Sequence, residues 1–359
     1  KFYGTDKMPD TPLIKKHQAL GATLTLSEGW QVPANFGNPA TEHLASRESA
    51  AVIDLSHRGK LRFSGPDTPK FLHGMLSNRA EDLLPGEGVY STFLTRQGKF
   101  VADLYLYRKP ESFDAILAPG MAAVLSEAID MYIIMDQVEV EDISISQAAL
   151  GLFGPESQKI LKGAGLDPGE LPEHGHIDIE GITIAREPWT GDEGYLLTIP
   201  IERSENLWDA LLKGGAIPAG LTAFETLTLE AGTPLFGLDM NSNINPMQAG
   251  LETTAIDFEK GCYIGQEVIA KIKYLGQVNR GLCGIRLIGE QIPPTGARVE
   301  ANGEEVGSVT RAAYCPTEGQ TLAFALLHRK AMDTGCQVSV HDGDISLNGE
   351  VTTLPFYKN

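Results

Sequence analysis

The stretch GVYSTFLTRQGKFVADLYLYR, residues 88–108, has the pattern of a β-hairpin. Aromatic and aliphatic residues alternate on both arms, and Gln97-Gly98 supplies the turn between them. Asp103 lies in the second arm among apolar neighbours, where a buried strand is expected. A lone buried carboxylate requires a partner or a function. Asp103 is therefore a candidate catalytic residue, with a solvated hairpin aspartate as the alternative.

The segments around this hairpin mix strand and helix signals. Residues 50–65 alternate like a strand, and residues 65–78 have one apolar helical face with Asp67 as the expected cap. A helix is expected near 120–132 and a strand pair over 138–152. Because strands and helices do not alternate regularly, the pattern favours an α+β fold over a doubly wound sheet.

The middle of the chain continues this α+β texture. We expect a short helix from Pro155 to about Gly163, a strand, loop and strand over 182–200, and an amphipathic helix over 202–215. Residues 221–232 begin with Thr222 and Glu225 in the spacing of a capping box.

Beyond residue 279 the chain changes to short strands separated by turn residues, which predicts a small all-β, barrel-like domain. The expected division is a first lobe with its irregular lead-in over 1–145, a second lobe over 146–278 and a barrel over 279–359.

Composition excludes several classes of protein. The chain has 359 residues and a formal net charge of −18, which argues against general nucleic-acid binding. No apolar run approaches the ~20 residues of a membrane helix. The four cysteines include no CxxC pair, so neither a zinc or iron–sulfur site held entirely by this chain nor a disulfide scaffold is expected. Glycine-rich nucleotide-binding loops are also absent from the sequence.

The stretch KGCYIGQE, residues 260–267, contains a candidate reactive cysteine, Cys262. Nearby positive charge, from Lys260, Lys271 and Lys273, would favour the thiolate, the form that acts as nucleophile. The alternative is a buried thiol in a loop packed by Tyr263 and Ile264. The remaining motif residues are Gly261 and Gly265, suited to a tight loop, then Gln266 and Glu267. For Lys260 and Glu267 the alternative is a solvated charged pair.

Several of these segments together resemble the aminomethyltransferase superfamily, whose founding member is the glycine cleavage T-protein. Four matching stretches are IDLSHRGKLRFSGPDTPKFL (53–72), the hairpin at 88–108, PWTGDEGY (188–195) and LTLEAGTPLFG (227–237). The resemblance implies a cloverleaf of two α+β lobes plus a C-terminal β-barrel, with tetrahydrofolate in a central channel.

The KGCYIGQE stretch is similar to a particular branch of that superfamily. A T-protein would be expected to read Lys-x-x-Phe-Ile-Gly-Lys-Glu there. Lys-Gly-Cys-Tyr-x-Gly-Gln-Glu instead resembles the YgfZ-type folate-binding proteins, which are associated with iron–sulfur cluster assembly or repair. This resemblance implies iron–sulfur client or assembly proteins as partners.

The resemblance also implies roles for individual residues. Tyr90 and Asp103 fall at folate-contacting positions, and Asp103 matches the catalytic aspartate. Tyr107 follows on the same strand, and Trp189 replaces a tyrosine of the family pattern. Arg58 stands where a T-protein usually has methionine, and it either meets the glutamate tail of folate or lies on the surface.

Two positions depart from the family pattern. Leu196 replaces the glutamate expected to hold the pterin ring, and Thr228 replaces an arginine. Glu193 or Asp192 is the expected substitute for the missing carboxylate, because a carboxylate can accept two pterin N–H groups.

Three functions follow as hypotheses. The first is a tetrahydrofolate-binding protein that assists iron–sulfur cluster assembly through Cys262. The second is a true folate-dependent aminomethyltransferase, and the third is a non-catalytic scaffold that has lost folate. The expected location is the bacterial cytoplasm, with mitochondria as the alternative.

Overall fold

The hairpin expected at residues 88–108 is present in the computed structural model, which describes residues 10–343 and 345–357. Strands β5 (Gly88–Leu94) and β6 (Phe100–Arg108) pair antiparallel. Gly98 in the turn has a φ of 71°, which glycine adopts without steric cost. The predicted hairpin is therefore confirmed, and it forms one side of the first of two mixed lobes.

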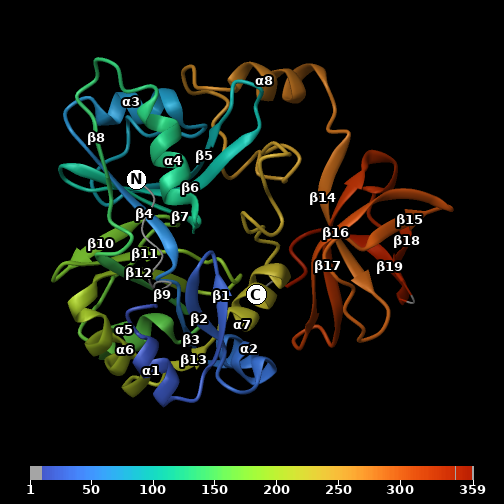
Figure 1. Ribbon diagram of the computed structural model, residues 1–359, viewed down its shortest axis with the longest axis horizontal. Coiled ribbons are helices and arrows are strands. Elements are labelled where there is room, and N and C mark those ends of the chain that lie inside the picture. The colour runs from blue at the N-terminus through green and yellow to red at the C-terminus, as the bar shows by residue number, and fades with distance from the viewer. Residues whose placement is uncertain (1–9, 344, 358–359) are drawn as a thin grey trace.

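The first lobe is built on a sheet with strand order β5-β6-β7-β4-β8 (Figure 1). Its other strands are β4 (Arg58–Ser64), β7 (Ser112–Pro119) and β8 (Glu139–Asp142). Helices α3 (Thr68–Met75) and α4 (Met121–Asp130) pack on one face of this sheet and enclose its apolar core.

The second lobe is built on a sheet with strand order β10-β11-β12-β9-β3-β13. The strands are β3 (Ala51–Asp54), β9 (Gln147–Phe153), β10 (His176–Ile179), β11 (Ile182–Arg186), β12 (Gly194–Pro200) and β13 (Ile217–Ala219). The helical segments around it are α1 (Ile14–Ala19), α2 (Pro39–Glu48), α5 (Ser157–Gly163), η1 (Ile201–Arg203), α6 (Ser204–Lys213) and α7 (Leu221–Glu230).

Strand β3 belongs to the second sheet although it precedes β4 in the chain. All four of its residues are buried, and they pack in the core of the second lobe and against the shared core between the lobes. The chain before Arg58 therefore packs with the second lobe, which differs from the expected assignment of 1–145 to the first. The domain limits themselves stay a prediction.

Four local expectations differ from the structure. The lead-in is not irregular throughout, because β1 (Thr23–Ser27) and β2 (Trp30–Asn35) form a hairpin; residues 1–9 lie outside the described residues. The strands over 138–152 do not pair, since β8 and β9 lie in different sheets. The Asp67 side chain does not cap α3 but accepts a hydrogen bond from the Gln137 backbone N–H. Helix α7 begins one residue before Thr222, after Gly220, without a side-chain cap.

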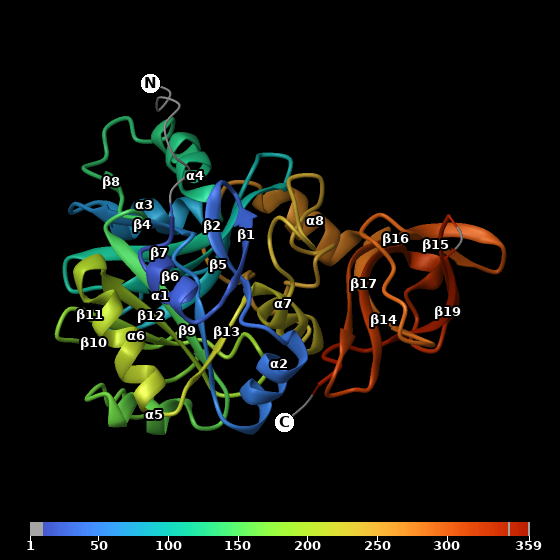
Figure 2. The same cartoon turned by 60° about the horizontal axis from the view of Figure 1, so that its bottom comes forward.

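The C-terminal domain is a closed barrel with strand order β14-β17-β16-β15-β18-β19, as predicted (Figures 1 and 2). Its elements are β14 (Arg280–Leu287), β15 (Arg298–Ala301), β16 (Glu304–Cys315), β17 (Gln320–His328), η2 (Arg329–Ala331), β18 (Gln337–Asp342) and β19 (Ile345–Thr352). Helix α8 (Gln266–Leu275) lies in the connection between the lobes and the barrel. The α+β cloverleaf with a C-terminal barrel is thus confirmed.

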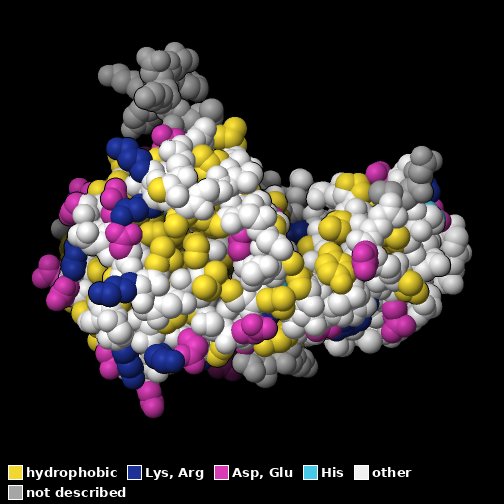
Figure 3. Space-filling view, turned by 90° about the horizontal axis from the view of Figure 1, so that it is seen from below, with side chains coloured by type: hydrophobic (Ala, Val, Ile, Leu, Met, Phe, Trp, Pro, Cys, Tyr) yellow, Lys and Arg dark blue, Asp and Glu magenta, His cyan; other side chains and the backbone are white. Residues whose placement is uncertain are grey.

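Surface and cysteine features complete the fold. No helix among the described residues is long and apolar enough to cross a bilayer. The coloured Lys and Arg side chains on the face in Figure 3 are interspersed with Asp and Glu. Cys283 and Cys315 are buried, Cys336 is half-buried and Cys262 is exposed, and all four are free thiols.

Candidate functional site

Two adjoining cavities lie where the two sheets face each other. Both are lined by Tyr105, Trp189, Thr233 and Pro234, so they meet along a shared wall. The first, here called the Asp103 chamber, also includes Arg58 and Asp103 and encloses about 840 Å³ with its open mouth; the second encloses about 970 Å³.

Strand β6 positions the polar side chains of this site through its two-residue period. Ala102, Leu104 and Leu106 point into the core of the first lobe. Tyr105 and Tyr107 point the opposite way, into the core shared between the lobes, and Asp103 lies on the same face of the strand. The sequence alternation therefore delivers a carboxylate to the space between the lobes.

Asp103 is a buried carboxylate with one satisfied oxygen. It is 5% exposed, and the Tyr90 hydroxyl donates to its Oδ2 across 2.8 Å. Its Oδ1 has no hydrogen-bond partner among the described residues. Burial raises the pKa of Asp103, while the hydrogen bond from Tyr90 and the positive charge of Arg58 oppose that rise. The second oxygen is therefore left without a protein partner in a residue that lines the chamber.

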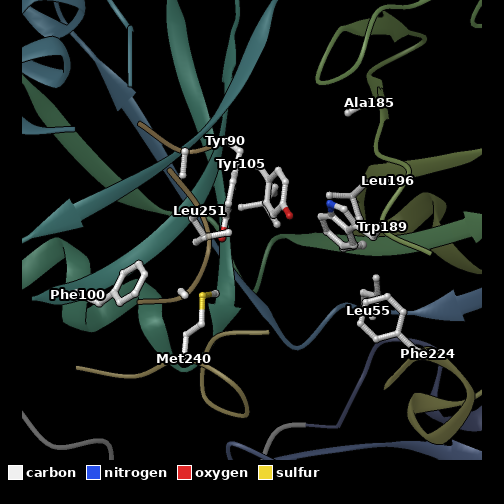
Figure 4. Close-up of a cluster of buried hydrophobic side chains, with 14 of the residues drawn as sticks. Leu55, Tyr90, Phe100, Tyr105, Ala185, Trp189, Leu196, Phe224, Met240 and Leu251 are labelled. Carbon is white, nitrogen blue, oxygen red and sulfur yellow. The ribbon is translucent and has the colours of Figure 1, made fainter. Parts of the chain in front are cut away.

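Aromatic rings form the wall next to this carboxylate (Figure 4). The Tyr90 and Tyr105 rings are stacked with centroids 4.6 Å apart, and Tyr105 and Trp189 lie 4.8 Å apart at an interplanar angle of 45°. Phe224 packs beyond Trp189 at 6.2 Å. Such faces favour a flat heteroaromatic ring by stacking and apolar contact.

Arg58, at the start of β4, is buried in the Asp103 chamber and not on the surface. It is 7% exposed, and its guanidinium carbon lies 4.8 Å from the centroid of the Trp189 ring. Its backbone carbonyl accepts a hydrogen bond from the Lys60 ammonium. The surface alternative for Arg58 is therefore wrong, because the side chain folds back over the indole.

A buried carboxylate that the sequence did not single out, Glu187, lies behind the aromatic wall. It accepts hydrogen bonds from the Tyr107 hydroxyl at 2.8 Å and from Trp189 Nε1 at 3.0 Å, and His174 Nδ1 lies 3.1 Å away. Burial lowers the pKa of His174, but the hydrogen bond and charge of Glu187 outweigh this and raise it. Burial, followed by the charge of Glu187, raises the pKa of Tyr107. Glu187 thus fixes the orientation of Trp189.

The structure separates some predicted site residues from the cavities. Tyr107 does not line either cavity, because its hydroxyl is directed to Glu187. Glu193 accepts a hydrogen bond from Tyr195, and Asp192 pairs with Arg47 at 2.6 Å. Neither carboxylate lines a cavity, so the expectation that one replaces the missing carboxylate at Leu196 is not supported by their geometry.

Thr228 occupies the position where the family pattern has arginine, and an arginine from the barrel contacts it. Arg311 of β16 donates to Thr228 Oγ1 and to the Glu225 carbonyl, each at 2.8 Å. Its guanidinium also pairs with Asp239 at 2.8 Å. Arg311 therefore ties the barrel to α7 beside the site.

The residues of the KGCYIGQE stretch mainly make structural contacts with the first lobe. The Lys260 ammonium donates to the backbone carbonyls of His73 in the last turn of α3 and of Leu76 and Asn78 just after it. Burial lowers the pKa of Lys260 to about 8. Lys260 is therefore not a solvated partner of Glu267, which lies exposed in the first turn of α8.

The other residues of this stretch place α8 against the turn of the β5–β6 hairpin. Gly265 has a φ of 85°, and a Cβ there would come within 2.6 Å of the Thr95 carbonyl oxygen at the hairpin turn. Tyr263 is buried, whereas Gln266 is half-buried and Gly261 is exposed. Cys262 is exposed and does not line either cavity.

The lysines expected near the Cys262 thiol are partly directed elsewhere. Lys260 is held by three carbonyls, and Lys273 lies 3.6 Å from Glu252 with its ammonium over the Phe258 ring. Among the described residues, no group of three or more His, Cys, Asp or Glu is arranged to hold a metal ion.

The two α+β lobes, the barrel and the carboxylate facing a shared cavity define one class of protein. The sequence matches the GCVT N-terminal domain family over residues 13–260 and the glycine cleavage T-protein C-terminal barrel domain over residues 280–358. The chain belongs to this glycine cleavage T-protein family.

Individual relatives agree with that assignment. Aminomethyltransferases from Cutibacterium acnes and Listeria monocytogenes are each 32% identical, covering 97% and 98% of this chain and 98% of each relative. The crystal structure of glycine cleavage system aminomethyltransferase T from Bartonella henselae superimposes with a TM-score of 0.92 at 26% identity, covering 98% of this chain and 99% of that one. The superfamily resemblance is confirmed, and these relatives favour the aminomethyltransferase hypothesis over the iron–sulfur one.

Proposed function

We propose that this protein is an aminomethyltransferase that transfers a one-carbon unit to tetrahydrofolate. The observation that carries the proposal is Asp103, which lines a cavity walled by Tyr105 and Trp189 and whose Oδ1 has no hydrogen-bond partner among the described residues. The names of its relatives support this reaction class. Aminomethyltransferases that match nearly the whole chain share about a third of its residues.

The residues present fit a reduced pterin. Tyr105 and Trp189 offer aromatic faces, and Asp103 Oδ1 offers an unused acceptor for a ring N–H. Tetrahydrofolate supplies the nucleophilic nitrogens that take up the one-carbon unit. Position 196 has leucine and not the glutamate of the family pattern. The indole N–H of Trp189 donates to Glu187 instead, and this hydrogen bond holds the Trp189 ring in the aromatic wall.

Asp103 has the chemistry that this transfer requires. A cation that develops next to its Oδ1 is stabilised by the negative charge of the carboxylate. The raised pKa also brings the carboxyl closer to the range in which it holds and releases a proton. The Tyr90 hydroxyl fixes the other oxygen, so that Oδ1 keeps one orientation toward the cavity.

Calorimetric titration with tetrahydrofolate tests this proposal, using wild type, Asp103→Ala and the exposed control Asp130→Ala. We expect binding in wild type and control, and clearly weaker binding in Asp103→Ala. A second assay supplies an aminomethylated lipoyl carrier and follows ammonia and methylenetetrahydrofolate together. Absence of folate binding in wild type would leave the scaffold hypothesis. Binding without turnover on the carrier would count against the carrier as donor.

We retain the role in iron–sulfur cluster assembly as a second candidate. Its support is the exposure of Cys262 within a loop in which Lys260, Tyr263 and Gly265 have structural contacts. Cys262→Ala should then fail to restore iron–sulfur enzyme activity in a strain that lacks this protein, while Gly261→Ala should restore it. Full restoration by Cys262→Ala would remove this candidate. The client proteins and the cytoplasmic location also stay predictions.

A further inference from the structure

The Asp103 chamber contains a buried guanidinium, that of Arg58, which lies over the Trp189 ring but has no hydrogen-bond or ion-pair partner among the described residues. Its Nε is buried and unsatisfied. A buried cation is costly unless it is paired, so a side chain kept in this state is suited to a ligand that brings an anion. Methionine, the family residue expected at this position, has no such capacity.

The other charges of the chamber are negative. Asp103, Glu28 and Glu225 line the same space as Arg58. Burial lowers the pKa of His57 to about 3, so this neighbour adds no positive charge near neutral pH. An anion alone would meet one cation and three carboxylates. A ligand that carries both a carboxylate and an ammonium group satisfies both signs of charge.

We propose that the Asp103 chamber binds a small zwitterionic amine of the amino-acid class, with its carboxylate on Arg58 and its ammonium group toward Asp103 Oδ1. Arg58 is a strong carboxylate ligand because its planar guanidinium can donate two parallel hydrogen bonds. Trp189 lies under the guanidinium and limits its rotation. This inference rests on the proposed function and specifies the class of amine that binds beside the folate. A carboxylate oxygen has two lone pairs, so Asp103 Oδ1 can accept from the amine and from a pterin N–H together.

The glutamate tail of tetrahydrofolate is another source of carboxylate. Glu28 at the mouth and Glu225 on the wall would repel the two carboxylates of the tail, which brings no ammonium group to offset them. A zwitterion presents the opposite balance, because its ammonium group offsets the carboxylates around Arg58. The charge distribution therefore favours the amino-acid ligand.

The test is calorimetry with the full chain saturated with tetrahydrofolate, using N-methylglycine and methylamine as probes. We expect N-methylglycine to bind at least tenfold more tightly than methylamine. Arg58→Met should abolish that preference, and Arg58→Lys should retain part of it. The matched control is Arg62→Met, on the same strand, whose arginine pairs with Asp114 at 2.8 Å outside the chamber; its preference should equal wild type.

The outcomes separate this inference from the proposed function. Equal affinity for the two probes, or no binding of either while tetrahydrofolate binds, would overturn the amino-acid site and leave the folate proposal intact. A third arm compares tetrahydrofolate with 6-methyltetrahydropterin, which has no glutamate tail. If Arg58→Met weakens only tetrahydrofolate, Arg58 serves the tail and the inference is wrong. The melting temperature of each variant shows whether it folds.

Discussion

The Tyr90 hydroxyl donates a hydrogen bond to Asp103 Oδ2 across 2.8 Å, while Asp103 Oδ1 has no partner among the described residues. The two residues are diagonal neighbours on adjacent strands of the β5–β6 hairpin, because Tyr90 is opposite Tyr105 and Asp103 is opposite Thr92. One oxygen is therefore held by the protein and the other is left for a ligand. This division of roles is the basis of the first two predictions.

Replacing Tyr90 by phenylalanine should loosen Asp103 without removing it. The hydrogen bond from Tyr90 lowers the pKa of Asp103 against the effect of burial, so its loss should raise that pKa further. We expect transfer activity to fall by about tenfold, the order of one charge-assisted hydrogen bond. The acid limb of the pH–rate profile should also move to higher pH. Steady-state rates across pH check this, and an unshifted limb would contradict it.

Replacing Asp103 by asparagine should lower the transfer activity and raise the stability of the fold. Loss of the carboxylate should reduce transfer by roughly 10²- to 10⁴-fold. Because burial raises the pKa of Asp103, its ionised form destabilises the fold at neutral pH. Asp103→Asn should therefore raise the free energy of unfolding by about 1 kcal/mol at pH 7.5.

The pH dependence of that gain provides the control. Below about pH 4, the usual pKa of aspartate, the carboxyl is protonated in both the folded and the unfolded chain, so the advantage of asparagine should disappear. Denaturant unfolding at both pH values measures the difference. A gain that persists in acid would show that the charge is not its cause.

The sequence predicted the parts of this site that depend on local pattern. The alternation in residues 100–107 identified a buried strand, and the same period of two could have added Tyr105, which shares a face with Asp103. Short strands beyond residue 279, separated by turn pairs such as Asn302-Gly303 and Asp342-Gly343, were enough to predict the barrel, which is confirmed. In these segments neighbouring residues along the chain determine the structure.

The parts that the sequence missed depend on contacts between distant segments. Glu187 has no local signal, because its partners Tyr107 and His174 come from other parts of the chain. Strand β3 looks like any short apolar strand, and only its packing assigns it to the second sheet. Lys260 looks like a surface charge in the sequence. Its burial depends on the backbone carbonyls at the end of α3, which are distant in the chain.

Gly265 is the position where α8 depends most on glycine. Its φ of 85° and the approach of a Cβ to within 2.6 Å of the Thr95 carbonyl oxygen both disfavour a side chain. We expect Gly265→Ala to lower the free energy of unfolding by about 2 kcal/mol, from combined strain and backbone displacement. Gly261→Ala is the matched control, because its nearest atom would be His73 Nε2 at 3.8 Å. Similar losses in both variants would contradict this role of Gly265.

Because of Lys60, the free energy of unfolding should increase as the pH rises above neutrality. Its ammonium is buried and donates to the carbonyls of Ser56 at 2.9 Å and Arg58 at 2.7 Å. Burial lowers its pKa from 10.5 to about 7. Between these two values the unfolded chain binds a proton that the folded chain does not, so stability increases with pH there.

One such proton corresponds to about 1.4 kcal/mol per pH unit. Compared with wild type, Lys60→Met should therefore lose up to this slope between about pH 7 and pH 10, whatever its absolute stability. The exposed control Lys70→Met should keep the wild-type slope, because its side chain is solvated in both states. Parallel stability curves for wild type and Lys60→Met would mean that Lys60 stays charged in the fold, held by the two carbonyls that connect it to Arg58.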